Sequence, residues 1–168
     1  GRPLVIVTAR PVIIAIDGTT RAKGIFNGLP EGSPFYVSGT ATPFYITYGG
    51  GDGNDVTLNT IPIVNGGEGD DVIAITLLPG NSLTFTLNGT PVLLPGPIPS
   101  FTYYGREADD VVTIDVDSQL LASGLGDFHG ATPPLAPYPM TIETLDGHDR
   151  LSFAPMSTAV SISLNDRG

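Results

Sequence analysis

The sequence predicts an all-β protein, a parallel β-solenoid or β-roll-like stack of strands with Gly/Asp turns; a β-sandwich is the alternative architecture. Three observations predict this class. Val, Ile and Thr are abundant, and these residues favour strands. The 22 Gly and 16 Pro make up more than a fifth of the 168 residues, so turns are frequent. Short apolar runs alternate with Asn-Gly, Asp-Gly and Pro-Gly dipeptides, and no long segment has the 3.6-residue period of a helix.

Strands are expected where short apolar or β-branched runs lie between these turn dipeptides. The first two, at residues 4–8 and 12–16, are almost wholly apolar and are separated by Pro11. The others are expected at residues 24–27, 35–38, 43–48, 56–59, 72–77, 82–87, 91–94, 100–104, 111–116, 140–144, 151–153 and 159–164. Residues 1–60 are interpreted as N-terminal apolar strands with a segment that closes a repeat. Residues 61–168 are interpreted as β repeats of about 39 residues, continuous with the first part.

An internal repeat is the most informative feature. Asp71, Asp110 and Asp149 are equally spaced, since 110−71 and 149−110 are both 39. A short strand follows each of them, and apolar strands precede the last two. Asp55 has the same local arrangement but stands only 16 residues before Asp71 (71−55). Each copy is too small to bury its own apolar face, so the copies are expected to stack or pack together.

Charge narrows the classes of partner. Seventeen acidic residues against seven basic ones give a net charge of −10, which disfavours nucleic acid and favours cations. The chain has no Cys, and it has no apolar run long enough to span a membrane as a helix. It begins at Gly1 without Met, so a processed subunit or an excised fragment is expected.

Two glycine-rich segments carry the candidate chemistry. Residues 50–58 and 66–74 match the calcium nonapeptide G-G-x-G-x-D-x-U-x. Glycines permit a tight turn that exposes carbonyl oxygens, and the Asp adds a carboxylate, which together suit Ca²⁺. The candidate metal ligands, including those of two degenerate later copies, are Asp52, Asp55, Glu68, Asp70, Asp71, Asp110 and Asp149. The alternative is that Asp and Gly only shape the turns, with the carboxylates accepting nearby backbone N–H groups; this is preferred for Asp110 and Asp149.

The nonapeptides resemble the repeats-in-toxin β-roll family, in which two stacked turns share an ion. The resemblance implies a calcium site at the turns of Asp55 and Asp71. Residues 24–32 (GIFNGLPEG) and 43–56 (PFYITYGGGDGNDV) look like the segment that closes autotransporter-type β-strand repeats in large bacterial surface proteins. The later 39-residue units are similar to repeats of giant cell-surface proteins. Both resemblances imply secretion, a cell-surface location and a structural or adhesive role.

The function expected is therefore a calcium-stabilised extracellular module, a building block of a bacterial surface fibre or large adhesin, and not an enzyme. Its expected partners are neighbouring copies of itself or other repeats of a larger surface protein, with glycans also considered. The apolar segment at residues 4–16 has two alternative roles. It is either donated as a strand to the next subunit or used as a strand of the chain's own core.

Two other functions are weighed against this one. A carbohydrate-binding or polysaccharide-cleaving β-helix needs exposed aromatic or paired acidic side chains, and the tyrosines that it would use are Tyr36, Tyr45, Tyr48, Tyr103, Tyr104 and Tyr138. Cross-strand packing of these tyrosines is the simpler interpretation. A Ser-His-Asp hydrolase would depend on His129 or His148, but no nucleophile-elbow motif accompanies them.

Overall fold

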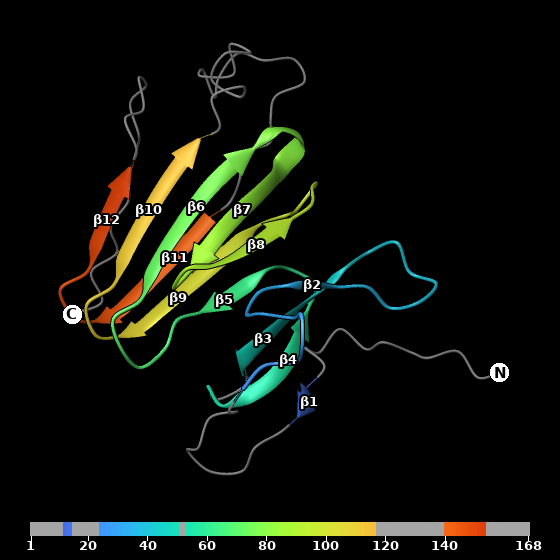
Figure 1. The fold of residues 1–168 in the computed structure, drawn as a ribbon, viewed down its shortest axis with the longest axis horizontal. Helices are drawn as coiled ribbons and strands as arrows, with labels where there is room; N and C mark the ends of the chain where they lie inside the picture. The colour runs from blue at the N-terminus through green and yellow to red at the C-terminus, as the bar shows by residue number, and fades with distance from the viewer. Residues whose placement is uncertain (1–11, 15–23, 51–52, 117–139, 154–168) are drawn as a thin grey trace.

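The computed structural model describes residues 12–14, 24–50, 53–116 and 140–153. Across these residues the chain is all-β (Figure 1), which confirms the all-β part of the predicted fold class. The one helical segment among them is a short 3-10 turn, Pro79–Asn81. The strands expected at residues 4–8 and 159–164 lie outside the described part of the chain.

The described strands follow one another with short connections. In chain order they are β1 (Val12–Ile14), β2 (Pro34–Phe35), β3 (Phe44–Gly50), β4 (Asp55–Asn59), β5 (Ile63–Asn65), β6 (Val72–Leu78), β7 (Ser82–Leu87), β8 (Thr90–Leu94), β9 (Phe101–Glu107), β10 (Val111–Val116), β11 (Met140–Asp146) and β12 (Arg150–Phe153). The bounds of β7 and β10 are those expected from the sequence, and most others differ by one to three residues.

The observed strands differ from the expected ones in three places. Residues 24–27 form no strand, because Gly24 and Gly28 have positive φ angles and Leu29 N–H closes a tight turn onto Phe26 O at 2.9 Å. β5 was not expected, because Pro62 interrupts its short apolar run. The strand expected at residues 35–38 is reduced to the two residues of β2.

The N-terminal strands form a four-stranded antiparallel sheet in the order β1-β4-β3-β2. β3 and β4 pair from Tyr45↔Asn59 to Gly50↔Asp55, with an irregularity near their connecting turn. β1 pairs with β4, so residues 12–14 are an edge strand of the chain's own sheet. For these three residues the pairing favours the chain's own sheet over donation to a neighbouring subunit.

Parallel strands related by 39 residues form the whole three-stranded sheet and one side of the five-stranded sheet. In the five-stranded sheet, with the order β12-β10-β6-β7-β8, Val72 pairs with Val111 and Val111 with Arg150. In the three-stranded sheet, with the order β11-β9-β5, Ile63 pairs with Thr102, and Phe101 with Met140. The predicted spacing of 39 residues is therefore the register of both sheets.

These pairings define three strand–turn–strand units that lie side by side. Unit 1 (residues 63–78) contains β5 and β6, unit 2 (101–116) contains β9 and β10, and unit 3 (140–153) contains β11 and β12. The antiparallel hairpin of β7 and β8 extends the five-stranded sheet beyond unit 1 (Figure 1). Unit 1 is thus followed along the sheet edge by a hairpin, and unit 3 lies at the opposite edge.

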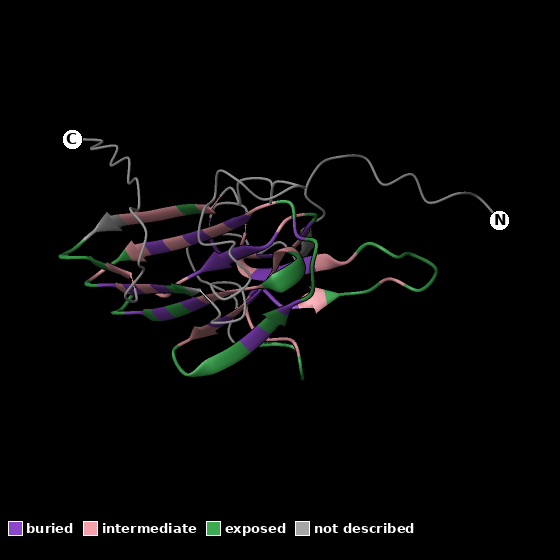
Figure 2. Cartoon of the chain, turned by 90° about the horizontal axis from the view of Figure 1, so that it is seen from above, coloured by how far each residue is buried: buried purple, intermediate pink, exposed green. Residues whose placement is uncertain are grey.

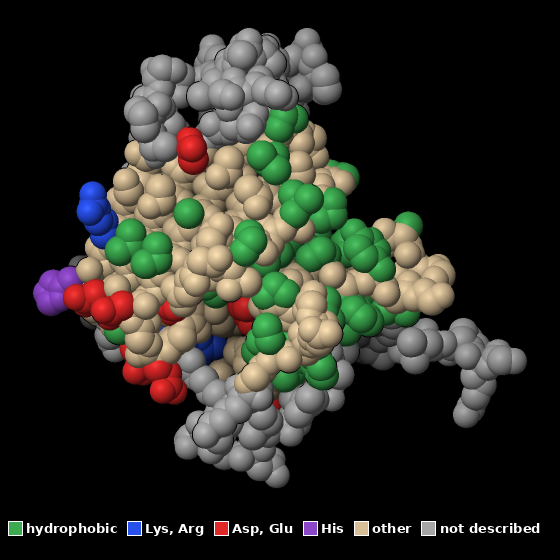
Figure 3. All heavy atoms as spheres, in the orientation of Figure 1, with side chains coloured by type: hydrophobic (Ala, Val, Ile, Leu, Met, Phe, Trp, Pro, Cys, Tyr) green, Lys and Arg blue, Asp and Glu red, His purple; other side chains and the backbone are tan. Residues whose placement is uncertain are grey.

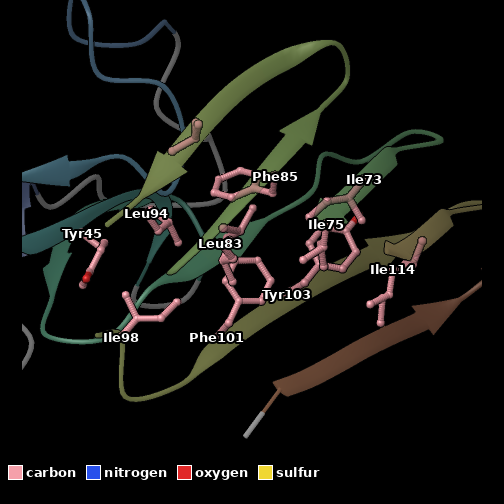
Figure 4. Close-up of a cluster of buried hydrophobic side chains, with 13 residues drawn as sticks. Tyr45, Ile73, Ile75, Leu83, Phe85, Leu94, Ile98, Phe101, Tyr103 and Ile114 are labelled. Atoms are coloured by element: carbon pink, nitrogen blue, oxygen red, sulfur yellow. The ribbon is translucent and has the colours of Figure 1, made fainter. Parts of the chain in front are cut away.

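The hydrophobic core lies between the five-stranded and three-stranded sheets. Buried and more exposed residues alternate along these strands (Figure 2), as expected for strands with one face on a core. Phe85 and Phe101 meet from the two sheets, with ring centroids 5.7 Å apart. The buried core residues, of which ten are labelled in Figure 4, are Tyr45, Val64, Ile73, Ile75, Leu83, Phe85, Val92, Leu94, Ile98, Phe101, Tyr103, Val112 and Ile114.

Candidate functional site

A row of three aspartates lies where the units turn from the three-stranded into the five-stranded sheet. Asp71 and Asp110 each stand two residues before a core-facing residue, Ile73 and Val112, so strand alternation points their side chains inward. They are 3% and 1% exposed. Asp71 N–H donates to Asp110 Oδ1 at 3.0 Å, and Asp110 N–H donates to Asp149 Oδ1 at 3.0 Å. We call Asp71, Asp110 and Asp149 the inner ladder.

The preceding residues form a second row, the outer ladder of Asp70, Asp109 and His148, whose members are exposed. Asp109 N–H donates to Asp70 Oδ1 at 3.2 Å, and His148 N–H donates to Asp109 Oδ1 at 2.8 Å. These bonds run opposite to those of the inner ladder. Each pair of neighbouring turns is therefore tied by two charge-assisted hydrogen bonds of opposite direction. Figure 3 shows acidic side chains gathered beside a histidine at this edge of the molecule.

Asn88, in the turn between β7 and β8, ends the inner ladder on the side of unit 1. Its Nδ2 donates to Asp71 Oδ1, and its Oδ1 accepts Val72 N–H at 2.9 Å. Asn88 and Gly89 both have positive φ angles, as an Asn-Gly hairpin turn requires. Gly67 N–H donates to the other oxygen, Asp71 Oδ2. Both carboxylate oxygens of the first ladder residue thus have donors from within the chain.

The middle carboxylate has a different electrostatic environment. Burial raises the pKa of Asp110, and the negative charges of Asp71, Asp149 and Asp70 raise it further, against the lowering effect of the Asp71 N–H donor. Asp110 Oδ2 and the hydroxyl of Tyr103 are both buried without a hydrogen-bond partner among the described residues. Burial, followed by the charges of the three inner-ladder aspartates, raises the pKa of Tyr103.

Substitution of Asp110 tests the inner ladder. Asp110→Ala is expected to lower the free energy of unfolding by about 2 kcal/mol, because it leaves the buried Asp71 N–H without an acceptor. Asp110→Asn keeps an acceptor oxygen and removes a buried negative charge, so its loss should be clearly smaller. Urea denaturation at neutral pH measures both. Equal losses in the two variants would show that the hydrogen bond to Asp71 is not what the side chain contributes.

Glycine is required at one position in each of the first two units. A Cβ on Gly66 would overlap Asp71 Oδ2 and lie 2.7 Å from Gly105 O, and a Cβ on Gly105 would overlap Asp110 Oδ2. Thr144 follows Gly105 by another 39 residues (144−105). The β9–β11 register shifts at Thr144, which pairs one residue late. The inward-pointing carboxylates of Asp71 and Asp110 thus explain why Gly66 and Gly105 have no side chain. In unit 3, where Thr144 replaces this glycine, the strand register is irregular.

The predicted metal ligands are placed in three groups. Asp70, Asp71, Asp110 and Asp149 belong to the two ladders, and Glu68 is exposed in the unit 1 turn. Asp55 begins β4 in the four-stranded sheet, where it pairs with Gly50 and has no place in the 39-residue register. Asp52 lies outside the described residues. Within the described ranges, no three His, Asp or Glu side chains converge in a way that would hold a metal ion.

A buried network that the sequence did not predict joins the four-stranded sheet to unit 1. The Glu31 carboxylate accepts the Thr47 hydroxyl, Tyr48 N–H at 2.8 Å and Asn65 N–H at 3.0 Å. Asn65 Nδ2 also donates to Thr47 Oγ1 at 2.6 Å. Burial raises the pKa of Glu31 more than these hydrogen bonds lower it. This single carboxylate therefore connects the segment before β2 with β3 and β5.

Arg106 extends the network to unit 2. Its Nη2 donates to Gly49 O at 2.7 Å and to Asn65 Oδ1 at 2.9 Å. Its Nη1 lies 2.8 Å from where a Cβ on Gly53 would be. The guanidinium thus fills the space between the first glycine-rich turn and β5. It places a fixed positive charge beside a turn that the sequence predicts as a calcium site.

The residues on which the alternative functions depend differ in how far they are buried. Tyr45 and Tyr103 are buried in the core, in agreement with the packing interpretation, whereas Tyr36 is 52% exposed. Tyr138 and His129 lie outside the described residues. The His148 side chain is exposed, with Nδ1 3.7 Å from Asp109 Oδ1. In the part of the chain that is described, no helix is long and apolar enough to cross a membrane.

Comparison with known proteins gives no identification. No protein-family model, curated protein or solved structure matches the chain.

Proposed function

We propose that this chain is a structural module of an extracellular surface fibre or large adhesin, and that its units stack as a parallel β-solenoid with a period of 39 residues. The observation that carries the proposal is the register itself. Two sheets repeat at the same spacing, and both ladders tie the turns between them. Such stacking buries a continuous core that no unit could bury alone.

The chemistry of the ladders supports a structural role over a catalytic one. The acidic residues that stand out in the sequence accept backbone N–H groups of the neighbouring unit, so their carboxylates hold units together. The exposed position of the outer ladder also gives the module a strongly acidic edge. The extracellular location in this proposal comes from the sequence resemblances to bacterial surface proteins.

Calcium at the glycine-rich turn of unit 1 belongs to the same proposal, because this turn carries Asp70 and Asp71 of the two ladders. A cation beside the ladders would reduce the repulsion among their carboxylates, and Asp110 Oδ2 is a ladder oxygen without a hydrogen-bond donor among the described residues. We expect the melting temperature to be higher in calcium than in chelator by about 3 °C for each kcal/mol of added stability. Magnesium at equal ionic strength is the control. Identical melting curves in calcium and chelator would contradict the calcium part alone.

Electron microscopy of the purified chain tests the structural role. With and without chelator, a fibre module should form elongated particles or filaments, and calcium should favour the longer ones. A parallel sample lacking residues 1–17 tests strand donation. Filaments from the intact chain that are lost in this variant would support donation. Compact monomers from the intact chain at all concentrations would contradict assembly of its own copies into a fibre.

A further inference from the structure

The two ends of the stack are not equivalent. On the side of unit 1, β6 pairs along its length with β7, from Ile73↔Leu87 to Leu78↔Ser82. Asn88 Nδ2 donates to Asp71 Oδ1 there, in the place of the backbone N–H that a preceding unit would supply. The outermost strand, β8, carries Pro91, which lacks an N–H and so weakens this edge as a pairing surface. The chain's own hairpin therefore closes this end of the five-stranded sheet.

On the other side, unit 3 is the last unit of the stack among the described strands, and its core positions are partly uncovered. Ile73 and Val112 are 0% and 1% exposed, but Leu151, at the next position of the same row, is 39% exposed. Asp149 is likewise exposed, whereas Asp71 and Asp110 are buried. The equivalents of the buried Phe101 and Tyr103 are Met140 and Ile142, which are only partly buried. Unit 3 therefore presents to its open side the residue types that units 1 and 2 bury.

We infer that the edge formed by β11 and β12 is a docking surface for one further parallel strand–turn–strand unit of the same chemistry. Continuity with the unit 1–unit 2 and unit 2–unit 3 interfaces defines this partner. This partner unit carries an aspartate whose carboxylate accepts Asp149 N–H. It also carries an apolar residue beside Leu151 and an apolar strand that pairs with β11. The inference rests on the proposed solenoid and names the partner that such a stack would take.

The outer ladder indicates that the partner unit should carry an acidic residue at its outer position. Asp70 and Asp109 accept N–H groups from the next unit, but the residue that follows in this row is His148. An acidic residue at the partner's outer position would continue the row beside the exposed His148 imidazole, as Asp109 does on the other side of His148. A second copy of this chain is a poorer occupant, because its unit 1 is already covered by β7.

A synthetic peptide of residues 101–116 is the probe, because it contains one complete unit with an acidic residue, Asp109, at the outer position. Added to the full chain, it should slow amide hydrogen exchange in β11 and β12 by roughly fivefold and leave β8 unchanged. The matched control is the same peptide with Asp110→Ala, which lacks the ladder carboxylate and should protect less. Absence of protection, or equal protection at β8, would overturn the inference. Protection that grows with chain concentration without peptide would also overturn it, because a second copy would then occupy the edge.

A disulfide test separates this inference from the proposed solenoid. The chain has no Cys, and Thr113 and Ser152 are register partners in β10 and β12. If Thr113→Cys/Ser152→Cys forms a disulfide and the peptide gives no protection, only the docking surface is wrong. If the disulfide fails to form, the stack itself is wrong.

Discussion

Replacing Glu31 with alanine is expected to lower the free energy of unfolding by about 3 kcal/mol or more. The carboxylate accepts the Thr47 hydroxyl and the backbone N–H groups of Tyr48 and Asn65, and it is their acceptor in a part-buried network. Alanine leaves all three donors without it, and each buried unpaired donor costs about 1–3 kcal/mol. Urea denaturation followed by circular dichroism measures the loss. The matched control is Glu107→Ala, which removes an exposed glutamate from β9.

The pH dependence gives a second test of Glu31. Burial holds its pKa above the ordinary value of 4.5, so the folded chain binds this proton more tightly than the unfolded chain. Glu31 therefore stabilises the fold most below pH 4.5, and this contribution falls as the pH rises through the folded-state pKa. The stability difference between wild type and Glu31→Gln should change with that sign over this range. A difference that is constant with pH, or a Glu31→Ala loss no larger than that of Glu107→Ala, would contradict the network.

Gly66→Ala is expected to cost about 3 kcal/mol, through overlap in a tightly packed place. The new Cβ would overlap Asp71 Oδ2 and lie 2.7 Å from Gly105 O and 3.1 Å from Tyr103 Oη. Because Gly105 O is a backbone atom of the neighbouring unit, relief would require units 1 and 2 to separate. Thermal and urea denaturation measure the effect, and weaker hydrogen-exchange protection of β5 and β9 would locate it.

Gly69→Ala, in the same turn, is the matched control for Gly66→Ala. No atom lies within 4 Å of a Cβ at Gly69, and its φ angle is not in the left-handed region. Its stability should be within about 0.5 kcal/mol of wild type. If both substitutions destabilise equally, the glycines serve the flexibility of the turn, and close packing of neighbouring units is not their role.

The stacked part of the fold could be read from the sequence because its pairing is periodic. Asp71, Asp110 and Asp149 are 39 residues apart, and the same spacing is the strand register. β5 was missed although Ile63–Asn65 stands 39 residues before residues 102–104, since Pro62 and the short length hid it. A search for the known period, and not for strand length, would have found it.

The nonapeptide of Asp55 shows where local pattern stops being informative. The sequence of its turn is similar to that of the turn at Asp71. In the structure, however, β4 pairs antiparallel with β3 and β1, outside the 39-residue register. Turn residues determine how the chain reverses, whereas partner strands are selected by long-range packing. The contacts of Glu31 and Arg106 with Asn65 join residues 34 and 41 positions apart and have no sequence period. Only the three-dimensional structure could place them together.

Cysteine cross-linking between β6 and β10 tests the 39-residue stack most directly. Ala74 and Thr113 are register partners, and neighbouring strands lie about 4.8 Å apart, within the range of a disulfide. In the otherwise cysteine-free chain, Ala74→Cys/Thr113→Cys should oxidise readily and retain its secondary structure. Ala74→Cys/Ser152→Cys, two strands apart, should remain reduced. Cross-linking of the second pair but not the first would contradict the parallel, in-register arrangement of the units.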